Sequence, residues 1–232
     1  MMIPPQCAKC PGKFCSRGVK DSEALLSFCP MRNYPDLIRE VLKRYSEEEI
    51  KRIYPISTMI ERDAYNWKEA RAGVEPRKPV RPRVREVAEF CKALGVKRVG
   101  IAFCIGLSDE AARVTEVLEG NGLEVCSALC KCGAADKEAL GVPAEYKIGD
   151  PEKTEVACNP LLQAELLNAA GTEVNVIVGL CVGHDMLFTR FSKALVTTLI
   201  VKDRFTGHNP LISLYTGYHR SLVIPPKETG AQ

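Results

Sequence analysis

No long apolar stretch occurs in this 232-residue chain, although 46% of its residues are hydrophobic. The longest apolar runs lie around residues 174–183 and 194–201. Both are well short of the roughly 20 residues that a membrane-spanning helix needs. The amino-terminal segment also lacks the charged and apolar regions of a secretory signal. We therefore expect a cytoplasmic protein that does not span a membrane.

Aromatic residues and net charge are also scarce. Phe, Trp and Tyr make up 6% of the residues, and the formal net charge is +3. Domains that bind nucleic acids concentrate more basic charge, and single-strand binders need aromatic rings on which bases stack. These two scarcities argue against a nucleic-acid partner.

Cysteine, in contrast, is abundant, with 11 residues in the chain. The cytoplasm keeps thiols reduced, so a disulfide framework is not expected there. Metal ligation or reactive-thiol chemistry explains this abundance better.

Four cysteines form a compact amino-terminal set, which we call the knuckle: Cys7, Cys10, Cys15 and Cys29. A Cys-x2-Cys turn holds two sulfurs near one metal, and two more sulfurs complete a tetrahedral shell. The same set suits a 4Fe–4S cluster, and its final Cys-Pro is similar to the bacterial ferredoxin run. The knuckle therefore predicts a metal site, with an iron–sulfur cluster and zinc both open.

A proline-rich linker at residues 73–83 divides the sequence into two expected parts. Residues 1–80 hold the knuckle and a helical extension, and residues 81–232 form an α/β domain. Helical periodicity in the first part covers residues 34–45 and then 46–72. Pro55 is expected to kink or split the second of these helices.

The second part alternates helical patterns with short apolar runs. The expected elements are strands at residues 98–103, 123–129, 174–180 and 195–201, and helices at 84–94, 108–119, 159–171 and 183–193. Nearly continuous apolar strands that alternate with helices indicate a parallel sheet covered on both faces. We expect an α/β fold with a flavodoxin- or Rossmann-like parallel sheet of about four strands.

Four further cysteines stand where a predicted strand ends or a helix begins: Cys104, Cys130, Cys158 and Cys181. A parallel sheet gathers such positions on its carboxyl edge, where open α/β sheets bind ligands. We expect these cysteines to hold a second metal or iron–sulfur centre, with Cys132 as the alternative to Cys130. The competing interpretation is that small apolar cysteines pack well near strand ends.

Charged and polar residues accompany these cysteines. Lys131, His184 and Asp185 are candidates for moving protons. Two interpretations of His184 and Asp185 are equally good. In one they activate Cys181 as a nucleophile, and in the other they belong to a helix cap. After the fourth strand, a second set is expected to bind a small anionic substrate: Lys202, Arg204, His208 and Asn209.

Several motifs together resemble a known family: GLCVGHDMLF, VTTLIVKDR, GHNPLISLY and CNPLLQAELLN, with the CxxC…C…CP opening. The chain resembles an uncharacterised family of cysteine-rich "metal-binding proteins", a domain of unknown function found largely in archaea and anaerobic bacteria. The resemblance covers nearly the whole chain, including the eight knuckle and edge cysteines, and departs from the family pattern at Cys132. It implies a cysteine-bound metal, and an anaerobic setting favours iron–sulfur chemistry over zinc.

Three functions are expected. The first is an iron–sulfur protein with one cluster in the knuckle and a second at the sheet edge. It would act on a small anionic molecule as a lyase, sulfur-transfer or redox enzyme, or serve a redox partner protein. The second is a zinc-stapled module that holds a partner through its basic linker. The third is a metal-free thiol enzyme built on Cys181, His184 and Asp185.

Overall fold

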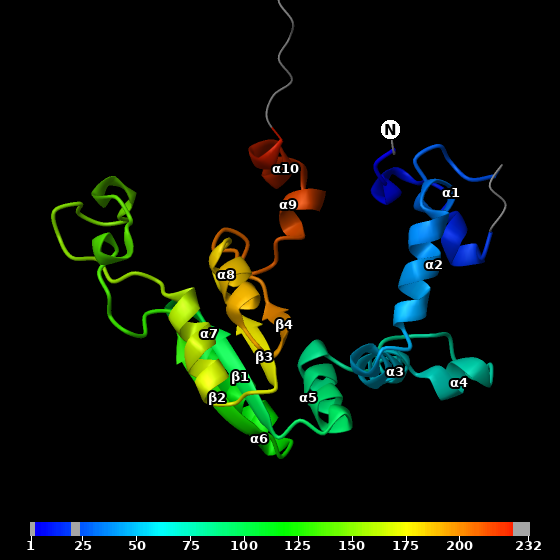
Figure 1. Cartoon of the computed structure of the whole chain (residues 1–232), viewed down its shortest axis with the longest axis horizontal. Helices are drawn as coiled ribbons and strands as arrows, with labels where there is room; N and C mark the ends of the chain where they lie inside the picture. The colour runs from blue at the N-terminus through cyan, green and yellow to red at the C-terminus, as the bar shows by residue number, and fades with distance from the viewer. Residues whose placement is uncertain (1–2, 20–23, 225–232) are drawn as a thin grey trace, which may run out of the picture. The chain divides into compact units, whose positions relative to one another are not determined.

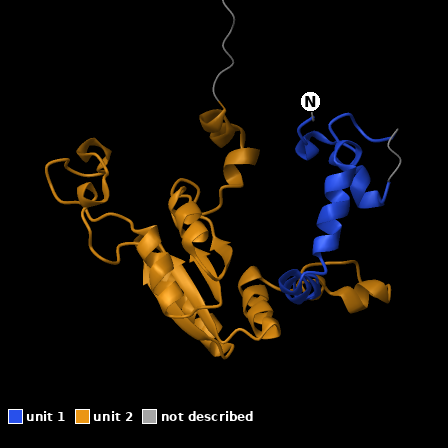
Figure 2. Cartoon of the chain, in the orientation of Figure 1, with its two compact units in different colours: residues 1–59 blue, residues 60–232 orange. Residues whose placement is uncertain are grey.

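The chain folds into two compact units, which Figure 2 shows in different colours. The computed structural model describes residues 3–19 and 24–224. Unit 1 is Met1–Met59 and unit 2 is Ile60–Gln232. The sequence predicts a domain boundary between residues 80 and 81, and the two compact units divide earlier along the chain.

Unit 1 consists of short helices and loops. The 3-10 turns η1 (Cys7–Lys9) and η2 (Phe14–Arg17) and the single-turn α1 (Pro30–Asn33) carry or adjoin the knuckle cysteines. The helix expected at residues 34–45 is α2 (Pro35–Arg44).

The next helix, α3 (Glu48–Asp63), contains Pro55 in its interior and is not split there. A proline removes one backbone N–H, and the turns on either side keep their own hydrogen bonds. The helical segment expected to reach residue 72 is instead interrupted after Asp63, and a short helix, α4 (Trp67–Arg71), follows.

The segment between α3 and the sheet is folded back on itself. The backbone N–H of Asn66 donates to the Lys78 carbonyl at 3.2 Å, and the Asn66 side-chain oxygen accepts from the Lys78 N–H at 2.8 Å. Tyr65 and Pro79 form an isolated antiparallel bridge. The proline-rich stretch is therefore tied to the end of α3, which accounts for a compact unit that begins at Ile60.

Unit 2 contains a four-stranded parallel sheet in the order β2-β1-β3-β4 (Figure 1). The strands are β1 (Arg98–Phe103), β2 (Glu124–Leu129), β3 (Val174–Val178) and β4 (Leu195–Ile200). The register pairs Phe103 with Leu129 on one side and with Val178 on the other, so these strands end at one edge. This order is flavodoxin-like and confirms the expected fold class.

Helices cover both faces of this sheet: α5 (Arg83–Leu94), α6 (Ser108–Gly120), α7 (Pro160–Ala169) and α8 (His184–Phe191). α5 packs against α6, and α7 packs against α8 (Figure 1). The β1–β2 and β2–β3 crossovers run in opposite directions along the sheet, so right-handed connections place α6 and α7 on opposite faces. The core between the layers includes the fully buried Val99, Ile101 and Val176.

Residues 131–157, between β2 and α7, form an excursion that we call the arm (Figure 1). It contains the turns η4 (Glu138–Leu140) and η5 (Ala144–Tyr146). The Glu155 carboxylate accepts backbone N–H bonds from Ile148 at 2.8 Å and Gly149 at 2.9 Å, and it pairs with Lys137 at 2.5 Å. Polar contacts of this kind hold the arm together.

Two short helices, α9 (Ile212–Tyr215) and α10 (Gly217–Val223), follow the sheet. Within the described residues, no helix has both the length and the apolar character needed to cross a bilayer.

Candidate functional site

The carboxyl edge of the sheet carries a cysteine after each of its first three strands. Cys104 follows β1, Cys130 follows β2, and Cys181 lies just beyond β3. The chain turns in opposite directions from β1 and β3, so the crevice between these two strands is the topological switch point. The backbone N–H of Cys104 donates to the Val178 carbonyl at 3.3 Å across this point.

Three of the four edge cysteines contact one another, and we call Cys104, Cys130 and Cys158 the thiol row. The Cys130 side chain hydrogen-bonds both Cys104 and Cys158. The backbone supports this arrangement: the Cys130 carbonyl accepts from the Asn159 N–H at 2.8 Å, and the Cys130 sulfur accepts from the Ile105 N–H at 3.3 Å. Cys104 and Cys130 are buried, and Cys158 is partly exposed.

The three thiols of the row have different acidities. The hydrogen bond from Cys130 and a second from His184 lower the pKa of Cys158 to about 4. The same contact with Cys158, together with burial, raises the pKa of Cys130. For Cys104, burial opposes ionisation, but the hydrogen bonds from Lys202, the Gly106 backbone and Cys130, together with the Lys202 charge, outweigh it and the pKa is lowered. The row therefore combines two thiols that ionise readily with a protonated one between them.

His184 and Asp185 have separate roles. The His184 imidazole hydrogen-bonds Cys158, and Lys131 contributes a nearby positive charge to the same thiol. The Lys131 ammonium itself donates to the Val156 carbonyl. Asp185 turns toward its own helix, where its carboxylate accepts from the N–H groups of Gly183 at 3.0 Å and Met186 at 2.8 Å.

Cys181 is paired with a different residue. Its sulfur accepts a hydrogen bond from the Arg204 guanidinium at 3.0 Å. Lys202, on the segment that follows β4, donates to the Cys104 sulfur. Two of the four residues expected to bind an anion therefore contact edge cysteines directly.

The other two expected anion-binding residues shape their own loop. The His208 ring accepts a hydrogen bond from the Asp203 backbone N–H at 3.1 Å, and His208 adopts a left-handed conformation with φ of 67°. The Asn209 carbonyl accepts from the Ile212 N–H at 3.1 Å, at the start of α9. These bonds position the loop beside Arg204.

The remaining cysteines of unit 2 stand apart from the row. Burial raises the pKa of Cys132, the alternative to Cys130, and it is Cys130 that contacts Cys104 and Cys158. Cys91 is fully buried in α5, and burial raises its pKa to about 11. Cys126 lies within β2.

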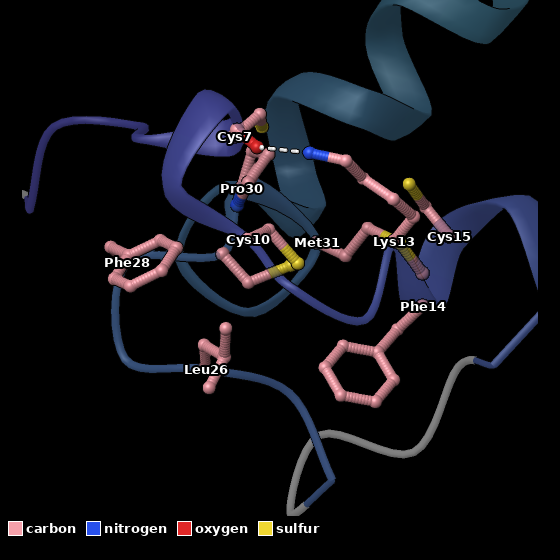
Figure 3. A pocket seen from close by; sticks show the side chains of 10 residues that line it. Cys7, Cys10, Lys13, Phe14, Cys15, Leu26, Phe28, Pro30 and Met31 are labelled. Atoms are coloured by element: carbon pink, nitrogen blue, oxygen red, sulfur yellow. Dashed lines mark hydrogen bonds between the residues drawn. The ribbon is translucent and has the colours of Figure 1, made fainter.

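The knuckle cysteines line one cavity in unit 1 (Figure 3). Cys7 lies in η1, Cys10 ends that turn, Cys15 lies in η2 and Cys29 precedes α1. The structure thus gathers all four expected ligands around a common space.

The ligands in the two cysteine sets can be compared with those that the expected metals require. Their donors, thiols and one imidazole, are the ligands that zinc and iron–sulfur clusters take. Within the described part of the chain, no group of three or more His, Cys, Asp or Glu side chains is arranged to hold a single metal ion. The chemistry of the donors fits a thiolate centre, and their arrangement does not match the shell of one ion.

Three contacts of this site were not expected from the sequence. These are the bonds between Lys202 and Cys104, between His184 and Cys158, and between Arg204 and Cys181. Each joins separate segments of the chain, and only the position of each residue at a predicted strand or helix end pointed to a shared edge.

Comparison with known proteins places the chain in a family. A family model described as "Protein of unknown function (DUF1847)" matches residues 29–199. The chain is also 38% identical over 222 residues to the uncharacterized protein MJ0455 of Methanocaldococcus jannaschii, covering 96% of this chain and 100% of that protein. The thiol row and Cys181 lie inside the matched residues. The family model and the archaeal relative agree with the expected uncharacterised family, and neither of their names refers to metal binding. The chain belongs to the DUF1847 family, whose function is unknown.

Proposed function

We propose that unit 2 is an iron–sulfur protein whose cluster is held by the thiol row at the carboxyl edge of the sheet. The observation that carries this proposal is the contact of Cys130 with both Cys104 and Cys158. These sulfurs come from three separate segments of the chain: the ends of β1 and β2 and the start of α7. Ionised or easily ionised thiols are the form that metals bind.

Three thiols and one imidazole are ligands that both zinc and iron–sulfur clusters take. The contacts join Cys104 to Cys130, Cys130 to Cys158 and Cys158 to His184. We favour a cluster because, within the described residues, no three potential ligands are arranged around one ion. Such a cluster would supply electron transfer, and Lewis acidity at an iron that lacks a protein thiolate.

The neighbouring side chains suit a small anionic partner molecule. The cationic groups of Lys202 and Arg204 contact Cys104 and Cys181, and Lys131 lies near Cys158. Positive charge at a sheet edge binds anions and also offsets the charge of thiolates. In this site Lys202 and Arg204 orient the anion, and His184 hydrogen-bonds the Cys158 sulfur.

The test is metal and sulfide analysis of the full chain prepared without oxygen. The wild-type protein is expected to be brown and to contain iron and sulfide. The triple variant Cys104→Ser, Cys130→Ser, Cys158→Ser should lose the iron and sulfide bound by the row. Cys126→Ser, in β2, is the matched control and should retain them. A zinc-loaded, colourless protein, or an unchanged iron content in the triple variant, would contradict the proposal.

One observation favours a second candidate, a metal-free thiol enzyme. Cys158 has a pKa of about 4 and a hydrogen bond from His184, which is the arrangement of an activated nucleophile. This version uses Cys158 in place of Cys181. It requires that Cys104→Ser leave the chemistry at Cys158 intact, whereas the cluster proposal requires that it disrupt the site.

A further inference from the structure

We propose that the knuckle of unit 1 binds one 4Fe–4S cluster, with Cys7, Cys10, Cys15 and Cys29 as its ligands, and that this cluster takes the place of a hydrophobic core. The inference rests on unit 1 alone. It is independent of the thiol row, so either site can be occupied without the other.

The first support is the space that the four cysteines share. They line a cavity of about 60 Å³ together with Phe14, Leu26, Phe28 and Met31 (Figure 3). A single water needs roughly 10–15 Å³ measured in this way, so the cavity takes something several times larger. Its lining is apolar except for the thiols and Lys13. Sulfur ligands in apolar surroundings suit an inorganic cluster.

The second support is how little else can hold unit 1 together. Among its described residues, Leu25 is the only buried one, with 3% of its surface exposed. The turns η1 and η2 and helix α1 contain no buried residue. A segment this short without a core usually needs a disulfide, a metal or an oligomeric partner to fold. Its cysteines are free thiols, which leaves them available to a metal centre.

The third support is the backbone around Cys10. The Cys10 sulfur hydrogen-bonds the backbone at Lys13, Gly12 and Phe14. A sulfur that accepts several backbone N–H bonds is stabilised as a thiolate, the form in which it binds iron. Lys13, in the same turn, adopts a left-handed conformation with φ of 44°.

The same geometry separates a cluster from zinc. Four sulfurs bound to one zinc ion at 2.3 Å would lie about 3.8 Å from one another and would enclose no cavity. The knuckle encloses one, and within the described residues no three potential ligands are placed to share a single ion. Sulfurs around a 4Fe–4S cube are spaced more widely. Lys13, whose ammonium donates to the Cys7 carbonyl at 3.2 Å, adds a positive charge beside the negative tetrathiolate cluster.

The experiment uses the full chain carrying Cys104→Ser, Cys130→Ser and Cys158→Ser, prepared without oxygen. This variant is expected to retain about four iron and four sulfide per chain, with the electron paramagnetic resonance signal of a reduced 4Fe–4S cluster. Adding Cys10→Ser should remove both, whereas adding Cys126→Ser should leave both unchanged. If the triple variant holds zinc or no metal, the knuckle inference is overturned. If it holds the cluster but no iron is lost relative to wild type, the proposal for the thiol row fails instead.

A reconstitution experiment covers the case in which Cys10→Ser unfolds unit 1. Removing the cluster from the triple variant with a chelator should lower the helical circular dichroism signal, because unit 1 loses the metal centre that stabilises its fold. Iron and sulfide added together should restore the signal. Recovery with zinc alone would contradict the inference.

Discussion

The imidazole of His184 hydrogen-bonds the sulfur of Cys158, a residue of another segment, although Cys181 stands closer to it in the sequence. Cys181 has its own partner in Arg204. The edge therefore holds two distinct thiol environments, one among other thiols and one facing a guanidinium. The two are separable by mutation.

The acidity of Cys158 predicts an unusual pH dependence of alkylation in metal-free protein. Because its pKa is lowered to about 4, Cys158 is a thiolate throughout the neutral range. Its rate of reaction with iodoacetamide should therefore be nearly flat between about pH 5 and 8. Cys132, whose pKa is raised by burial, should react about tenfold faster with each added pH unit over that interval. Mass spectrometry of the labelled peptides measures both rates.

Replacing the imidazole gives the corresponding control. His184→Ala removes one of the hydrogen bonds that stabilise the Cys158 thiolate, so the alkylation profile should move to higher pH. A profile that stays flat in this variant would show that His184 does not set the acidity of Cys158.

Lys202 is predicted to control the acidity of Cys104. Lys202→Met removes the ammonium that donates to the Cys104 sulfur, so burial is opposed less and the pKa of this thiol should rise. Alkylation of Cys104 should shift to higher pH. Lys193→Met, at an exposed position after α8, is the matched control and should leave the profile in place.

The arm is predicted to open when its central carboxylate is neutralised. Glu155→Gln weakens the ion pair with Lys137 and the hydrogen bonds from the Ile148 and Gly149 N–H groups. Residues 138–155 should therefore be cleaved faster by a protease at neutral pH. Glu145→Gln, an exposed change in the same arm, should have no such effect.

Acid should act on the arm in the same direction. The Lys137 hydrogen bond and the backbone N–H groups lower the pKa of Glu155 from 4.5 to about 2. A depressed carboxyl pKa contributes stability that is complete above about pH 4.5 and is lost as pH falls toward 2. Nuclear magnetic resonance of the Ile148 and Gly149 amides in that interval measures the loss, and amides unchanged at pH 2 would contradict it.

Gly100 is predicted to be essential for packing in β1. A Cβ at this position would lie 2.0 Å from the Asn175 side-chain oxygen and 2.9 Å from a methyl carbon of Leu167. Asn175 is fully buried and hydrogen-bonds Thr172 at 2.7 Å and Ser192 at 2.9 Å, so it has little room to move. Gly100→Ala should lower the free energy of unfolding by about 1–3 kcal/mol in denaturant titration. Gly120→Ala, in open space at the end of α6, should be neutral or stabilising.

Much of the secondary structure of unit 2 can be predicted from the sequence, because the patterns that specify it are local. β1 occupies the predicted residues 98–103, and α7 begins at Pro160 where Asn159 accepts the Leu162 N–H at 2.9 Å. Strand ends in a parallel sheet share an edge, so the neighbourhood of Cys104 and Cys130 could also be predicted.

Other features depend on contacts that no local pattern records. The arm is built from ion pairs between residues such as Lys137 and Glu155, which carry no hydrophobic period. The partner of His184 depends on how α8 packs beside α7, which places it at Cys158. Pro55 likewise does not split α3, although a proline inside a helix lowers its propensity.

The thiol row is assembled from the ends of β1 and β2 and from the start of α7, with the whole arm between its second and third members. Its sulfurs can meet only after the arm has closed and the first two strands have paired. A ligand that needs all three sulfurs can therefore bind only once residues 104–158 have folded together.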